Sequence, residues 1–143
     1  MRRTSAAMGP LEELRAKIAG FPGYDGDLER RRSDEYVRSY LGEALAELAA
    51  RCALLAELQQ RVDELVLRVG FADPRDFAAH HVIGAKNVAD EGGEVASADA
   101  ATVELADRAA SVDAASASLY LDDVAAALDE RDAAIRAATM KMT

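Results

Sequence analysis

Residues 41–69 read LGEALAELAARCALLAELQQRVDELVLRV and place an apolar side chain at every seventh position, namely Leu41, Leu48, Leu55, Val62 and Val69. More apolar residues fall three or four positions after these, which is the spacing of one face of a helix. We call the row the leucine seam; its members are Leu41, Leu45, Leu48, Cys52, Leu55, Leu58, Val62, Leu65 and Val69. Because a long apolar row is unfavourable in water, we expect other helices to cover it, from the same chain or from a second copy.

The leucine seam belongs to a helix that we expect to begin at Asp27 or Ser33 and to end at Val69, just before Gly70. Its outer face supports this prediction, because acids precede bases by four residues, as in Asp34/Arg38 and Glu57/Arg61. Two short helices are also predicted. Pro10 begins one that runs to Ile18, and Asp73-Pro74 begins one that runs to Ile83.

A second long helix is predicted from Ser97 to Ala138, with a less regular apolar face. That face comprises Val103, Ala106, Ala110, Ala117, Tyr120, Leu121, Val124, Leu128 and Ile135. Asp113 and nearby serines weaken the middle of this helix, so it either stays whole, bends or breaks into two. Residues 85–96 lack a clear period and are expected to form a flexible connection, and the ends, 1–9 and 139–143, are expected to fray.

These elements predict an all-α fold, an antiparallel bundle or helical hairpin of two long helices plus short helices. One domain over residues 1–143 is expected from the chain length. Two helices would leave the leucine seam half covered, so either dimerisation or a compact monomeric bundle must complete it. We favour self-association.

Composition narrows the class of function. The 143 residues carry a formal net charge of −9, which argues against general nucleic-acid binding, because phosphates repel a net anion. No apolar run approaches the ~20 residues of a membrane span. The single cysteine, Cys52, has no partner for an internal disulfide, which favours a cytoplasmic location.

Few residues carry recognisable chemistry. His80 and His81 point about 100° apart as neighbours on a helix, which is poor geometry for sharing a metal, although Asp76 and His80 could share a face. The acids at 122, 123, 129, 130 and 132 stand beside arginines and favour a solvated charged face. Cys52 has no nearby activating group and is expected to be an inert thiol. We therefore expect no catalytic residue, cofactor or metal, with a metal-binding or catalytic bundle as the third alternative.

Arginines are concentrated near the start of the first long helix, at Arg30, Arg31, Arg32 and Arg38. Such a concentration could contact an anionic partner, such as a lipid headgroup at a membrane surface. The competing interpretation is that these arginines pair with nearby acids such as Asp34 and Glu35.

Residues 21–26, Phe-Pro-Gly-Tyr-Asp-Gly, precede this basic helix start, and Pro22-Gly23 is predicted to form the central pair of a tight turn. The combination resembles the opening of an uncharacterised family of bacterial helical proteins that begin with a Pro-Gly-Tyr-x-Gly turn and a basic helix. The resemblance covers about a tenth of the chain and implies a bacterial origin, but no function.

The sequence thus predicts a non-enzymatic helical scaffold or adaptor that acts through self-association or a protein partner, most simply as a homo-oligomer joined at the leucine seam. The alternative is a peripheral binding module that uses the Arg30 to Arg38 end.

Overall fold

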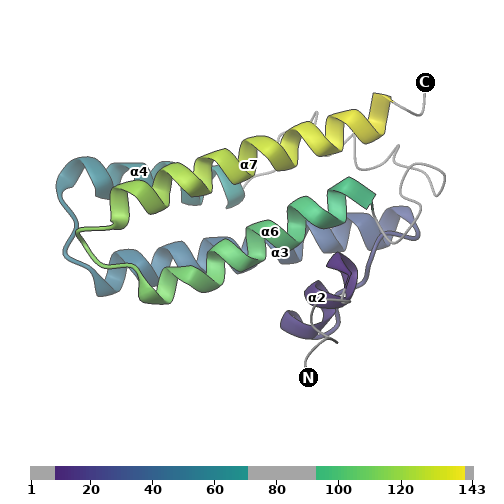
Figure 1. Ribbon diagram of the computed structural model, residues 1–143, viewed down its shortest axis with the longest axis horizontal. Coiled ribbons are helices and arrows are strands. Elements are labelled where there is room, and N and C mark those ends of the chain that lie inside the picture. Colours follow the sequence, from purple (N-terminus) through teal and green to yellow (C-terminus); the bar gives the residue numbers. More distant parts are fainter. Residues whose placement is uncertain (1–8, 71–92, 141–143) are drawn as a thin grey trace.

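The protein is all-α. The computed structural model describes residues 9–70 and 93–140, and Figure 1 shows their arrangement. The elements are α2 (Pro10–Lys17), α3 (Asp27–Arg51), α4 (Ala56–Gly70), α6 (Gly93–Arg108), the 3-10 turn η1 (Ala109–Ser111) and α7 (Ala117–Met140). Among these described residues, no helix is long and apolar enough to cross a membrane.

Helices α3 and α4 form one hairpin, and α6 and α7 form a second one. The two hairpins lie side by side, with their chain reversals at the same end of the bundle (Figure 1). Ion pairs fix the relative direction: Arg61 of α4 contacts Asp122 of α7, and about two turns later on both helices Arg68 contacts Asp129. Both numbers rise together, so α4 and α7 are parallel. The two chain reversals, residues 52–55 and 112–116, consequently meet at one end of the bundle.

The prediction of one continuous helix that ends at Val69 is therefore wrong, because the chain reverses at residues 52–55. Cys52 adopts an extended conformation, with φ −103° and ψ 140°, and ends α3. The heptad spacing survives the break because both arms of a hairpin turn their apolar stripes to one core. Leu41, Leu45 and Leu48 on α3 pack with Val62, Leu65 and Val69 on α4 in a single buried cluster.

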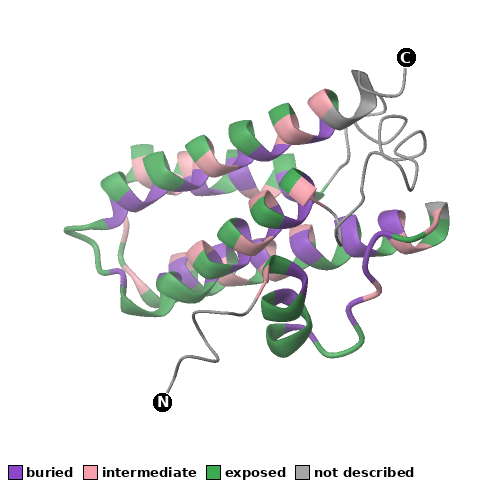
Figure 2. Ribbon diagram, turned by 45° about the vertical axis from the view of Figure 1, so that its right-hand side comes forward, coloured by how far each residue is buried: buried purple, intermediate pink, exposed green. Residues whose placement is uncertain are grey.

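One of the five residues at the seven-residue spacing, Leu55, lies outside that core. Leu55 lies in the reversal and is 71% exposed, while Cys52 and Leu58 are half-buried. The helices of the same chain cover the buried members, as the purple inward stripes in Figure 2 show. Gly42 helps the two arms approach, because a Cβ at this position would lie 3.3 Å from Val69 Cγ2.

The second predicted long helix is also two helices, and the break lies at Asp113 and the nearby serines, where the sequence indicated a weak point. α6 already begins at Gly93, so residues 93–96 of the predicted flexible connection are helical. Asp113 and Ser116 then cap each other: Ser116 N donates to Asp113 Oδ1 at 2.9 Å, and Asp113 N donates to Ser116 Oγ at 3.1 Å. This local pattern ends one helix and starts the next. Ala110, predicted on the apolar face, is exposed.

The N-terminal part docks on α6 and on the start of α3. Leu11 and Leu14 of α2 are buried with Phe21 and Tyr24 in a second core cluster. Ser33 does not cap α3, which begins at Asp27; it is fully buried, accepts a hydrogen bond from Gly23 N and donates one to Gly23 O. Gly23 has φ +93°, as the predicted Pro-Gly turn requires.

Some predictions fall outside the described residues. These are the helix from Asp73 to Ile83, most of the connection 85–96, and most of the two ends expected to fray. Of the ends, Gly9 precedes α2 and its amide donates to Glu12 Oε1, and residues 139–140 belong to α7.

The chain reversal predicts that two leucines of the leucine seam, Leu45 and Leu55, contribute very differently to stability. Leu45→Ala removes a fully buried side chain and should lower the free energy of unfolding by about 2–5 kcal/mol. Leu55→Ala should change it by less than about 0.5 kcal/mol, because that side chain is exposed. Urea unfolding followed by circular dichroism measures both. Equal losses would contradict the chain reversal at residues 52–55.

Candidate functional site

The most unusual feature of the interior is a cluster of buried charges where α3, α6 and α7 meet. Arg131 of α7 donates from Nε to Asp99 Oδ1 of α6 and from Nη2 to Asp34 Oδ1 of α3, each at 2.5 Å. The three side chains are at most 5% exposed. Tyr24, from the turn before α3, donates its hydroxyl to Asp99 Oδ2. We call Tyr24, Asp34, Asp99 and Arg131 the buried charge cluster.

Arg38 closes the cluster on its outer side. Its Nε and Nη2 contact Asp34 Oδ2 at 2.9 and 2.8 Å, and its Nη1 donates to Val69 O, near the end of α4, at 3.0 Å. Every helix of the two hairpins therefore contributes to or touches this network.

The electrostatics of the cluster favour the ionised pairs. Burial alone would lower the pKa of Arg131, but the carboxylates of Asp99 and Asp34 outweigh it and raise that pKa above its usual value. Burial raises the pKa of Tyr24 well above 10.0, and the Asp99 carboxylate adds to the effect. The phenol thus stays a hydrogen-bond donor.

The cluster is suited to fixing the fold rather than to binding. All four carboxylate oxygens of Asp34 and Asp99 already accept hydrogen bonds from side chains of this chain. A metal or a substrate would have to displace one of these partners. Among the described residues, no group of three or more His, Cys, Asp or Glu side chains could hold a metal ion. His80 and His81 lie outside the described residues.

The sequence analysis missed this cluster, although a signal was present. Arg131 continues the α7 stripe of Leu121, Val124, Leu128 and Ile135, at the position where an apolar residue is expected. Asp99 similarly occupies the buried stripe of α6. A charge on an apolar stripe indicates a buried partner of opposite charge. The prediction of a solvated charged face beside the acids of α7 is therefore wrong for Arg131, which is 4% exposed.

The arginines predicted to contact an anionic partner are mostly used within the fold. Arg30 is 4% exposed and donates from Nη1 to Tyr24 O, and Arg38 binds Asp34 and Val69 as described. Arg31 is half-buried, and Arg32 is exposed. The structure therefore does not present the four side chains on one open surface.

Four of the five predicted acids of α7 are exposed, as expected, and Asp132 is half-buried; several of them form ion pairs between the two hairpins. Arg61 contacts Asp122, and Arg68 contacts both Asp129 and Asp132, at distances from 2.5 to 3.0 Å. These exposed pairs orient the two hairpins and add little stability individually.

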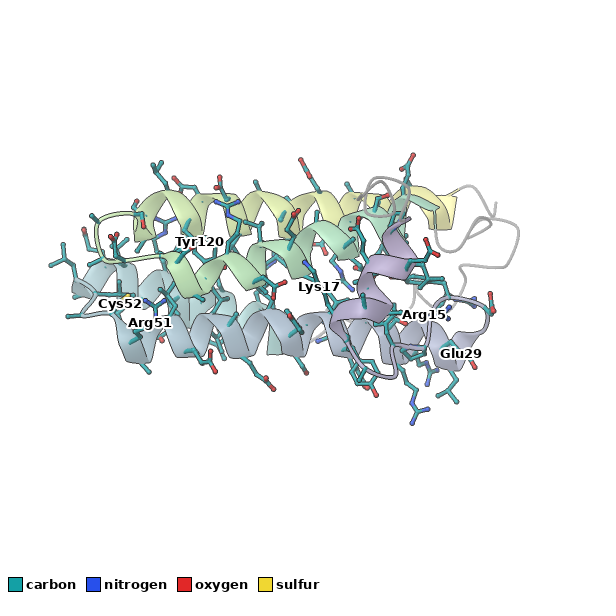
Figure 3. All side chains as sticks on the ribbon, turned by 60° about the horizontal axis from the view of Figure 1, so that its bottom comes forward. Arg15, Lys17, Glu29, Arg51, Cys52 and Tyr120 are labelled. Carbon is teal, nitrogen blue, oxygen red and sulfur yellow. The ribbon has the colours of Figure 1, made fainter. Side chains whose placement is uncertain are left out.

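The chain reversals place exposed apolar residues at one end of the bundle. Arg51 binds the two reversals together by donating to Ala109 O at 2.6 Å and Val112 O at 2.9 Å, and the half-buried Cys52 thiol lies 3.6 Å from Val112 O. Figure 3 labels Arg51 and Cys52 at this end. Leu55 and Leu119 are 71% and 73% exposed. We define the hairpin tip by its exposed apolar residues, Ala53, Leu55, Ala56, Ala114, Ala115 and Leu119.

A groove of about 290 Å³ lies between α3 on one side and the end of α6 with η1 on the other. Glu43, Glu47 and Asp107 line it together with alanines, and we call it the acidic groove. At its far end from the tip, Asp107 accepts a hydrogen bond from the Tyr40 hydroxyl at 2.5 Å and binds Lys17 Nζ of α2 at 2.9 Å. Figure 3 labels Lys17, which reaches from α2 towards α6.

These contacts shift two pKa values. Burial alone would raise the pKa of Asp107, but the hydrogen bond from Tyr40 and the Lys17 ammonium outweigh it and lower that pKa. The bond to Asp107, with some burial, raises the pKa of Tyr40 to about 12.

Comparisons with known proteins identify no relative. No family model, no curated protein and no solved structure matches the chain.

The buried charge cluster predicts a large difference between two arginines. Arg131→Met leaves Asp99 and Asp34 buried without their shared cation and should lower the free energy of unfolding by about 3–5 kcal/mol. Arg68→Met removes exposed pairs and should cost under about 1 kcal/mol. Adding Asp99→Asn to Arg131→Met should recover part of the loss, because it removes one uncompensated charge. Urea unfolding tests all three variants, and equal effects of Arg131→Met and Arg68→Met would contradict the cluster's role.

The tyrosines predict loss of stability in alkali. Because the pKa of Tyr24 is higher in the folded than in the unfolded chain, its stabilising effect is full below about pH 10 and declines as pH rises towards the folded value. Absorbance of tyrosinate should show Tyr24, Tyr40 and Tyr120 protonated in the folded chain at about pH 11. Tyr24→Phe should weaken the alkaline decline in stability. A Tyr24 that ionises at its ordinary pKa while the chain stays folded would refute the assignment.

Proposed function

We propose that this protein is a non-enzymatic helical adaptor that acts by self-association through the hairpin tip. The supporting observation is the pair of exposed leucines, Leu55 and Leu119, contributed by both hairpins to one end of the bundle. Exposed large apolar side chains gathered at one place are typical of protein contact sites.

Charge supports a second copy as the occupant. Two copies of a chain with net charge −9 repel each other, so a contact between them is favoured where the surface carries no charge. Residues 52–56 and 112–121 contain a single charged residue, the exposed Asp113. The hairpin tip is therefore much less charged than the chain as a whole, so two copies that meet there oppose fewer like charges than they would elsewhere.

This proposal relocates the contact expected from the sequence. The buried members of the leucine seam are covered by α6 and α7 in this fold, whereas Leu55 stays exposed. Self-association at the tip leaves both hairpins intact and buries Leu55, the residue of the seven-residue spacing that lies outside the core.

Sedimentation velocity over a range of concentrations tests the tip. The unaltered chain should form a concentration-dependent dimer, and Leu55→Asp combined with Leu119→Asp should shift it to monomer without loss of helical circular dichroism, because four leucine surfaces become charged. Leu67→Asp is the matched control, since Leu67 is 60% exposed but lies on α4 away from the tip. A chain that stays monomeric at every concentration, or a dimer that survives the double substitution, would refute the proposal.

A further inference from the structure

We propose that the acidic groove between α3 and α6 is a docking site for a basic amphipathic helix of a partner protein. The inference rests on the proposed adaptor role but concerns a different surface from the hairpin tip. Three observations carry it: the shape of the groove, its charge and the way α2 already meets one end of it.

The shape suits a helix. The groove follows one face of α3 from Tyr40 to Arg51, a length of roughly 16 Å at 1.5 Å per residue, or about three turns. Its lining includes Ala44, Ala106 and Ala109, small side chains that allow another backbone to approach. Ala110 lies exposed at its edge.

The charge specifies the kind of helix. Glu43 and Glu47 stand four residues apart on α3, so they form a row along the groove. Both are exposed, and neither has a hydrogen bond or ion pair within the described part of the chain, whereas Arg51 at the tip end is held by two carbonyls. Lysines or arginines at the same spacing on a partner helix would complement them.

The protein itself supplies a precedent at the other end. α2 is a short amphipathic helix that packs on α6 through Leu11 and Leu14, and its last turn places Lys17 on Asp107, which lines the groove. A partner helix in the groove would continue this established contact towards the tip, with a cation on Glu43 and Glu47 as Lys17 is on Asp107. Helix-in-groove recognition of this kind is common in protein assemblies.

The test uses the full chain and a labelled alanine-rich peptide helix of about four turns with lysines four residues apart. Fluorescence anisotropy at low salt should detect saturable binding. A peptide of the same composition with lysines two residues apart should bind less tightly, because its charges fall on opposite faces.

Two variants locate the binding. Glu43→Gln with Glu47→Gln should weaken it about fivefold to tenfold, since two ion pairs are lost. Ala110→Trp should weaken it by obstructing the groove without changing the charge. The matched control is Glu57→Gln with Glu130→Gln, which removes the same charge from exposed positions on α4 and α7 and should leave binding within about twofold.

No binding at low salt, or equal losses in the groove and control variants, would overturn the inference. The results of the tip experiment and of the groove experiment are independent of each other. If the chain dimerises through Leu55 and Leu119 but does not bind the peptide, the proposed adaptor function stands and the inference about the groove is refuted. A monomeric chain that binds the peptide through Glu43 and Glu47 loses self-association and keeps the groove.

Discussion

The bridge from Arg131 to Asp34 and Asp99 is the contact on which the arrangement of the two hairpins depends. Apolar stripes alone allow helices to slide by a turn or to exchange neighbours, because leucines and alanines pack in many registers. A buried guanidinium between two carboxylates is satisfied in one register only, and every alternative leaves a charge unpaired in the core. Tyr24 extends the same constraint to the N-terminal turn, so the segment before α3 is held against α6 by the group that aligns the helices.

The sequence predicts the class of fold because helical periodicity is a local property. It predicts α2 from Pro10 and the Pro-Gly turn from Gly23 for the same reason. It does not predict the reversal at Cys52, since Leu48, Leu55 and Val62 keep their seven-residue spacing whether the chain continues or folds back. Asp113 and the nearby serines indicated a weak point in the second helix, because their side chains compete for backbone groups, but they did not predict that the chain reverses there. The difference between the two reversals is thus a difference in capping chemistry.

The candidate surfaces were harder to predict than the helices. Arg30 and Arg38 looked like a basic surface, but charge along a sequence does not say which side chains face inward. Arg30 donates to Tyr24 O and Arg38 donates to Val69 O, and these acceptors are backbone atoms that no charge pattern reveals. Arg131 and Asp99 were legible in principle as charges on apolar stripes. Their pairing across 32 residues becomes visible only when α6 and α7 are placed together.

The shared direction of the hairpins has an electrical consequence. At the tip, α3 and α6 end with their carbonyls while α4 and α7 begin with their amides, so two negative and two positive ends of helix dipoles meet there. The partial charges largely cancel across the end of the bundle, and Arg51 donates hydrogen bonds to Ala109 O at the start of η1 and to Val112 O just after η1. The helix ends therefore add little net charge at this end of a strongly anionic molecule, and Asp113 is the only charged residue in the two reversals, residues 52–55 and 112–116.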